Sequence, residues 1–128
     1  MNKKTVYEFA NAINEHNTDK MYSLMTDDHK FIDAHGSEVM GKDKMKMDWK
    51  DHFRRFPDYK IEITNIFANG HFLGAFGFAS DTSKGQQTDN NASYRPASWK
   101  VIVHNNKIKL WQVYDDEKIQ FETKKVSL

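Results

Sequence analysis

An aspartate and a histidine stand two residues apart at the end of an apolar run, in the segment FIDAHGSEVMG at residues 31–41. On a strand this spacing places Asp33 and His35 on the same face, so both are exposed or both face the interior. Such a carboxylate can act as a base toward a carbon-bound proton, and the imidazole could partner it in acid–base chemistry. The alternative is structural: Asp33 bonds to the backbone of a turn at Gly36, and His35 is an exposed turn residue.

A second candidate carboxylate lies near the end of the last expected strand. Trp111, Val113 and Asp115 occupy alternate positions there and therefore share one face of the sheet. If that face borders a cavity, Asp115 is a second acid or base. The alternative is that Asp115 is a solvated strand-end acid beside Asp116.

The turn at Asn105-Asn106 decides which residue lies opposite Trp111. A two- or four-residue loop pairs Trp111 with Lys100, whereas a three-residue loop pairs it with Trp99. Lys100 facing a pocket would favour an anionic ligand, and Trp99 would favour an apolar one. The sequence leaves this register open.

The histidines form no pattern typical of a metal site. Asp33 and His35 offer two ligands, but the other histidines have no metal-type spacing: His16, His29, His52, His71 and His104. A site of two histidines and one carboxylate would need one of them to converge on the pair in space. The sequence contains no cysteine, which excludes thiolate catalysis and cysteine zinc sites. We expect neither a metal nor an organic cofactor.

The elements that position these residues are expected to be helices followed by strands. A first helix is predicted at 5–15, beginning with a capping box at Thr5, and a short second helix is predicted to begin at Thr18. A third helix is predicted at 42–56 and is ended by Pro57. Strands are predicted at 30–33, 37–40, 59–68, 71–80, 97–104 and 107–115, with a turn at Asn69-Gly70 and a polar hairpin loop at 81–92. This order indicates one α+β domain with helices packed on one face of a strongly curved antiparallel sheet.

The composition narrows the partners. A formal net charge of +1 and the lack of a basic stripe argue against nucleic-acid binding. No apolar run approaches the ~18 residues that would suggest a membrane span. The lack of cysteine and of an apolar signal-peptide segment leads us to expect a cytoplasmic protein.

The ordered elements resemble the nuclear-transport-factor-2-like superfamily, and more narrowly its SnoaL-like group. The similar segments, from about Val6 to Asp116, are MTDDHKFIDAHG, GKDKM, FPDYKIEI and NNKIKLWQVYDD. The resemblance implies a single SnoaL-like domain over 1–128, in which a cone-shaped, cystatin-like α+β fold wraps a curved sheet around helices. It also implies a cavity between the concave face and the helices, and a homodimer through the sheet face. Members include ketosteroid isomerases, polyketide cyclases, dehydratases, epoxide hydrolases and non-catalytic binding proteins, so the fold does not decide the reaction.

The resemblance also bears on single residues. Asp33 falls where ketosteroid isomerases carry their proton-shuttling aspartate, and Asp115 resembles an aspartate of SnoaL-like cyclases. However, Phe9 stands where the isomerases have a donor tyrosine, and residues 97–104 contain no carboxylate. The donors of an oxyanion hole are therefore missing, which argues against steroid isomerisation.

Pockets of the superfamily are lined from the third helix and the long strands. Residues that could border a small, apolar or aromatic ligand, or else belong to the core, are Trp49, Phe53, Trp99, Trp111 and Val113. We therefore expect an isomerase, cyclase, dehydratase or hydrolase that uses Asp33, with His35 or Asp115, as acid and base. The alternatives are a non-catalytic small-molecule-binding protein and a dimerising protein–protein module.

Overall fold

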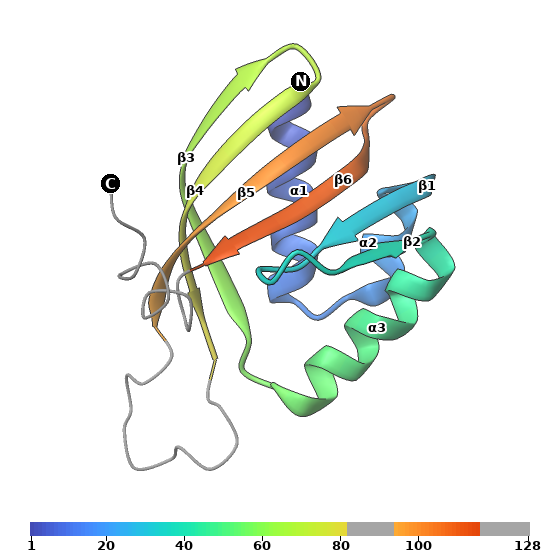
Figure 1. Ribbon diagram of the computed structural model, residues 1–128, viewed down its shortest axis with the longest axis vertical. Coiled ribbons are helices and arrows are strands. Elements are labelled where there is room, and N and C mark those ends of the chain that lie inside the picture. Colours follow the sequence, from blue (N-terminus) through green and yellow to red (C-terminus); the bar gives the residue numbers. More distant parts are fainter. Residues whose placement is uncertain (82–93, 116–128) are drawn as a thin grey trace.

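The computed structural model describes residues 1–81 and 94–115 of the chain. All but the first residue of the predicted 81–92 loop lies outside this part. Within it the elements follow the predicted order, helices first and long strands last (Figure 1). They are α1 (Asn2–Asn14), α2 (Thr18–Ser23), β1 (Met25–Ile32), β2 (Glu38–Met40), α3 (Lys42–Arg55), β3 (Lys60–Asn69), β4 (Phe72–Ser80), β5 (Arg95–His104) and β6 (Lys107–Asp115).

The strands form one six-stranded sheet in the order β2-β1-β6-β5-β4-β3. The sheet curves around α1, while α3 lies beside the end formed by β1 and β2 (Figure 1). The predicted α+β class is confirmed. One strand pair departs from the antiparallel expectation, because β1 runs parallel to β6. These two strands are far apart in the chain, so no hairpin forces them to be antiparallel.

The starts of the first two helices differ from the prediction. Helix α1 begins at Asn2, so the expected capping box is wrong and Thr5 is a buried residue inside the helix. Helix α2 is capped by Asn17, whose side chain accepts a hydrogen bond from the Lys20 N–H at 3.0 Å, and not by Thr18. Both shifts are local and leave the apolar face of each helix directed inward.

The pairing of Trp111 in the last hairpin, which the sequence left open, is set by a β-bulge. The turn of this hairpin has two residues, Asn105 and Asn106, both with positive φ. A bulge next to the turn then shifts the pairing by one position, so Trp111 lies opposite Val101 rather than Lys100 or Trp99. The rule for a two-residue loop, which pairs Trp111 with Lys100, therefore predicts the wrong partner for Trp111.

The concave face of the sheet and the helices enclose the core. Trp99 and Trp111 lie there with ring centroids 6.1 Å apart, and the ring of Phe9 is 4.8 Å from Trp111. Phe9 is fully buried and belongs to this core. Among the described residues, no helix is both long and apolar enough to cross a membrane.

Candidate functional site

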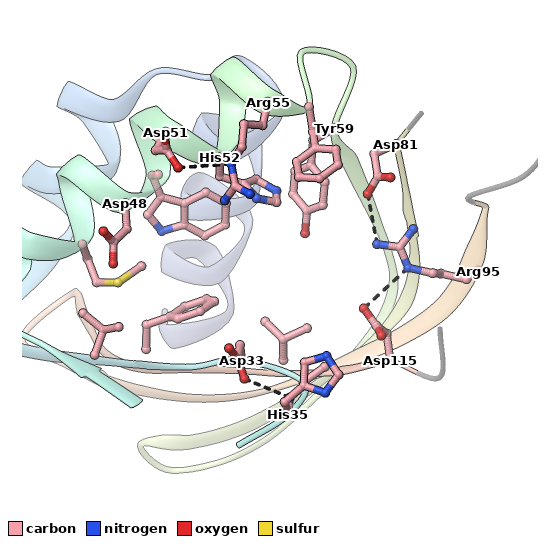
Figure 2. A pocket seen from close by; sticks show the side chains of 17 residues that line it. Asp33, His35, Asp48, Asp51, His52, Arg55, Tyr59, Asp81, Arg95 and Asp115 are labelled. Carbon is pink, nitrogen blue, oxygen red and sulfur yellow. Dashed lines mark hydrogen bonds and ion pairs between the residues drawn. The ribbon is translucent and has the colours of Figure 1, made fainter. Parts of the chain in front are cut away.

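A cavity of about 690 Å³ opens between α3 and the end of the sheet formed by β1, β2, β5 and β6 (Figure 2). Its apolar lining includes Phe31, Val39, Met45, Trp49, Phe56 and Val113. Its ionisable lining comprises five aspartates, two arginines, two histidines and Tyr59. The cavity therefore combines an apolar body with polar groups, as small-molecule sites do.

One wall comes from the inner face of α3 and the segment that follows it. Trp49 and His52 are one helical turn apart and their rings meet edge to face at 5.6 Å. The chain then turns, and Tyr59 packs its ring 4.6 Å from that of His52. Burial lowers the pKa of His52 to about 4, so its imidazole is neutral at pH 7.

Tyr59 is nearly buried, and its hydroxyl points into the cavity (Figure 2). Burial raises the pKa of this phenol well above its usual range; Arg95 acts in the opposite direction, whereas Asp81 and Asp115 raise it further. The hydroxyl therefore remains protonated at neutral pH and can donate a hydrogen bond.

The opposite wall carries a cluster of three charges. Arg95, at the start of β5, lies between two carboxylates: its Nη2 is 3.1 Å from Asp81 Oδ2 and its Nε is 3.5 Å from Asp115 Oδ2. All three side chains are largely buried, with exposed fractions of 13%, 7% and 13% for Arg95, Asp81 and Asp115. The cross-strand register explains the cluster, because Arg95 is opposite Ala79 and Ala97 is opposite Asp115.

Asp33 and His35 lie at the end of β1, in the turn that leads to β2. Asp33 Oδ1 accepts hydrogen bonds from the backbone N–H groups of His35, at 2.9 Å, and Ser37, at 3.0 Å. This is the turn-capping contact that the structural alternative described. Both side chains nevertheless line the cavity, and His35 is exposed at its edge.

Two further carboxylates line the cavity from α3 and are paired toward the helix surface. Asp48 accepts from Lys44 Nζ at 3.0 Å, and Asp51 from Arg55 Nε at 3.1 Å and from Arg54. These i,i+4 and i,i+3 pairs are typical of exposed helix faces. They hold charge at the cavity edge without a deeper partner among the described residues.

The predicted ligand-contacting residues separate into two groups. Trp49 and Val113 line the cavity, as does Asp115 on the same strand face as Val113. Phe53, Trp99 and Trp111 are buried in the core and are not part of the lining. Phe53 instead stacks on His16, with ring centroids 4.0 Å apart.

The lining residues that the sequence reasoning missed include four deeper ionisable groups: His52, Tyr59, Asp81 and Arg95. A signal existed for two of them. Tyr59 is two residues before the buried Ile61, and Arg95 is two before the buried Ala97, so strand alternation places both on the inner face. Nothing in the local sequence marks Asp81, because its partner Arg95 comes from the neighbouring strand.

The described histidines and carboxylates do not gather into a metal site. Across residues 1–81 and 94–115, no three histidine, aspartate or glutamate side chains converge closely enough to hold an ion. The aspartates of the cavity lining instead form ion pairs with arginine and lysine side chains or accept from the backbone.

Comparison with known proteins places this arrangement in a family. A family model described as SnoaL-like domain matches residues 6–119. A search of curated proteins found no match. Solved structures with the same fold include an NTF2-like protein of unknown function from Cytophaga hutchinsonii ATCC 33406, with a TM-score of 0.73 and 17% identity over 94% of this chain and 95% of that chain.

Two other structures have more specific descriptions. One is a hypothetical protein with a ketosteroid isomerase-like fold from Catenulispora acidiphila DSM 44928, in complex with trimethylamine (TM-score 0.77, 18% identity, 86% of this chain and 83% of that chain). The other is an LEH-like epoxide hydrolase from M. tuberculosis (TM-score 0.75, 17% identity, 93% of this chain and 85% of that chain). At these identities the likeness shows the fold alone. The family match covers most of the chain and agrees with the fold, and the protein belongs to the SnoaL-like domain family.

Proposed function

We propose that the protein is a cofactor-independent enzyme that binds a small, largely apolar molecule in the cavity and transforms it by acid–base chemistry. The reaction class is isomerisation, cyclisation, dehydration or hydrolysis. The observation that carries the proposal is the largely buried Asp81–Arg95–Asp115 cluster in the cavity wall. The cluster places two carboxylates against one guanidinium, largely away from bulk water.

Burying these charges is difficult to explain by stability alone. A buried ion pair loses hydration that its mutual attraction often fails to repay, so apolar residues would stabilise the same position at least as well. Buried charged groups in a cavity are characteristic of functional sites. Arg95 fixes both carboxylates at 3.1 and 3.5 Å, and it would hold Asp115 in place for proton transfer to or from a bound molecule.

Asp33 is the second acid–base group in this proposal. One of its oxygens is held by the backbone of the turn, which fixes the carboxylate at the edge of the cavity. His35 follows in the same turn and would exchange protons between Asp33 and solvent. Asp33 and Asp115 enter the cavity from adjacent strands, since β1 pairs with β6.

The first reaction to test is epoxide opening, because one protein of the same fold is named an epoxide hydrolase. Styrene oxide is a suitable probe, as it is small, aromatic and uncharged. The variants are Asp115→Asn and Asp33→Asn, and Asp48→Asn is the matched control because Asp48 lines the cavity but is paired with the surface Lys44. Diol formation is measured by chromatography, with further panels of β-hydroxy and polyketone compounds.

We expect Asp115→Asn to lower kcat/KM about 100-fold or more, the usual loss when an acid–base group is removed. Asp33→Asn should lower it less, and Asp48→Asn should leave it within about threefold. If a substrate is found and its turnover survives both Asp115→Asn and Asp33→Asn, these carboxylates are not the acid and base.

The second candidate function is non-catalytic binding of a small molecule. The contacts of Asp33 favour this function, because a carboxylate that caps a turn stabilises the fold without any catalytic role. The apolar wall around Trp49, Phe56 and Val113 would suffice to hold an aromatic ligand. Binding without turnover of any panel compound would support this function.

We also propose a homodimer through the outer face of the sheet and a cytoplasmic location. The outer face carries four exposed aromatic residues, Phe67, Phe72, Phe76 and Tyr114, which are 65%, 60%, 46% and 48% exposed. Phe76 and Tyr114 both lie beside Ser98 across neighbouring strands. Exposed apolar patches of this kind are typical of protein–protein contacts.

A further inference from the structure

The hydroxyl of Tyr59 is a polar group in the cavity without a protein partner among the described residues. The side chain is 7% exposed, and Figure 2 shows its oxygen directed into the cavity, toward the side that carries Arg95 and Asp115. The hydroxyl does not sit in a gap of the core, because the residue is part of the cavity lining. The hydroxyl is therefore open to the cavity and available to a bound molecule, whose acceptor oxygen it could satisfy.

The Tyr59 ring is held in place on several sides. It meets the His52 ring edge to face at 4.6 Å and lies 6.2 Å from the Trp49 ring. Its backbone is fixed as well, since its N–H donates to the Phe56 carbonyl at 3.1 Å and its carbonyl is 3.0 Å from His16 Nε2. The direction of the hydroxyl is therefore set before any ligand binds, which is what precise hydrogen bonding requires.

We propose that Tyr59 is the hydrogen-bond donor of the site and that the ligand is a small apolar molecule with an uncharged acceptor oxygen, such as a ketone or an epoxide. This inference rests on the proposed function, because it assumes that the cavity binds a small molecule. Tyr59 would supply a donor that the resemblance to ketosteroid isomerases places in the first helix, at a position where this chain has Phe9. The hydroxyl reaches the cavity from the segment after α3 instead.

The charges around Tyr59 favour an uncharged oxygen over an anion. The cation in this wall, Arg95, already lies between Asp81 and Asp115. A carboxylate or phosphate ligand would therefore have to compete with these two carboxylates for the guanidinium. Tyr59 keeps its O–H at neutral pH, and burial raises the pKa further, so a proton is available for donation to an acceptor oxygen.

The test compares a ketone with its hydrocarbon isostere. Acetophenone and α-methylstyrene have nearly the same shape, and only the ketone can accept a hydrogen bond. Affinities are measured by ligand-observed NMR titration for the wild type, Tyr59→Phe and the control Tyr114→Phe, whose hydroxyl lies on the exposed face of β6. Thermal unfolding of each variant confirms that it is folded.

Tyr59→Phe should weaken acetophenone binding by about threefold to tenfold, as expected for one lost hydrogen bond between uncharged groups. Binding of α-methylstyrene should change by less than about twofold, and Tyr114→Phe should change neither affinity. Equal losses for both probes would make Tyr59 a packing residue and overturn the inference. So would an unchanged affinity for acetophenone, or a wild type that binds neither probe at millimolar concentration.

These outcomes are separate from those of the proposed reaction, because the readout is binding and not turnover. A selective loss of ketone affinity in Tyr59→Phe, together with no turnover of any panel compound, would keep the donor role and leave the protein as a binding module. Turnover that depends on Asp115, together with no ketone effect at Tyr59, would keep the enzyme and reject the donor.

Discussion

Acidification should destabilise the protein through His52, because the folded state holds this imidazole in its neutral form. The ring lies among the rings of Trp49, Phe53, Phe56 and Tyr59, at centroid distances of 4.6 to 6.0 Å. Its Nε2 is buried and makes no hydrogen bond to a described residue. Burial is the main cause that lowers its pKa to about 4; Asp81 acts against this, whereas Arg55, His16 and Arg95 add to it.

The sign and size of the effect follow from the two pKa values. The unfolded chain has the ordinary pKa of 6.5, so below that pH the unfolded state binds a proton that the folded state rejects. The stability contributed by neutral His52 is therefore complete above pH 6.5 and is lost as the pH falls toward 4. Each pH unit in that window costs about 1.4 kcal/mol, and the loss from pH 7 to pH 5 is about 2 kcal/mol.

The assay is urea unfolding at pH 7, 6 and 5, followed by the fluorescence of the tryptophans. His52→Phe keeps an aromatic ring in the same surroundings and cannot be protonated. The free energy of unfolding of this variant should fall between pH 7 and pH 5 by about 2 kcal/mol less than that of the wild type. His104→Gln removes an exposed imidazole and is the matched control, which should retain the wild-type pH dependence.

His29 will contribute separately to the acid sensitivity. It is fully buried, burial lowers its pKa, and its Nδ1 is 2.8 Å from the Ile108 carbonyl oxygen. His52→Phe should therefore reduce the pH dependence without abolishing it. If wild type and His52→Phe lose the same free energy between pH 7 and pH 5, the imidazole of His52 is hydrated and protonates in the folded state, and the reasoning is refuted.

Two further changes test the sheet. Gly77→Ala should destabilise the protein by about 3 kcal/mol or more, because the new Cβ would lie 1.8 Å from the Glu62 carbonyl oxygen. Calorimetry should show a melting temperature lower by on the order of 10 °C. The control Gly74→Ala, whose Cβ would be 3.6 Å from the nearest atom, should change the melting temperature little. Equal melting temperatures of the two variants would contradict the close approach at Gly77. Phe76→Lys on the outer face should convert a dimer into a monomer in light scattering. A wild type that is monomeric at about 100 μM, where a complex of micromolar affinity would form, would reject the sheet-face dimer.

The order and type of the elements could be predicted from the sequence because they depend on local periodicity. Helix α3 is predicted by its apolar face and by Pro57, and it ends at Arg55. The helix starts were less accurate, since several residues near each start can serve as a cap. The parallel pairing of β1 with β6 was not predictable, because it depends on where β1 enters the sheet after two helices.

The register of the last hairpin could not be predicted from the length of its turn, because a β-bulge follows the turn. Asn105-Asn106 forms the two-residue turn that the sequence suggested, and both residues have positive φ. The bulge beside it moves Trp111 by one position, so that Trp99 and Trp111 share the concave face and Lys100 is exposed. An anionic ligand held by Lys100 is thereby excluded. A bulge of this kind leaves no reliable mark in a sequence without glycine at the site.

The candidate site was predictable only where a single strand determines it. Asp115 follows Val113 by two residues, so alternation places both side chains on one face, and both line the cavity. The Asp81–Arg95–Asp115 cluster depends instead on three chain segments that meet because Ala79 is opposite Arg95 and Ala97 is opposite Asp115. A carboxylate acquires a partner through such registers, and its neighbours in the sequence do not reveal that partner. Tyr59 differs, because its inward position could be predicted from the buried Ile61 two residues later, and only the lack of a partner for its hydroxyl required the structure. Its substitution is therefore the best test of how the cavity recognises a ligand.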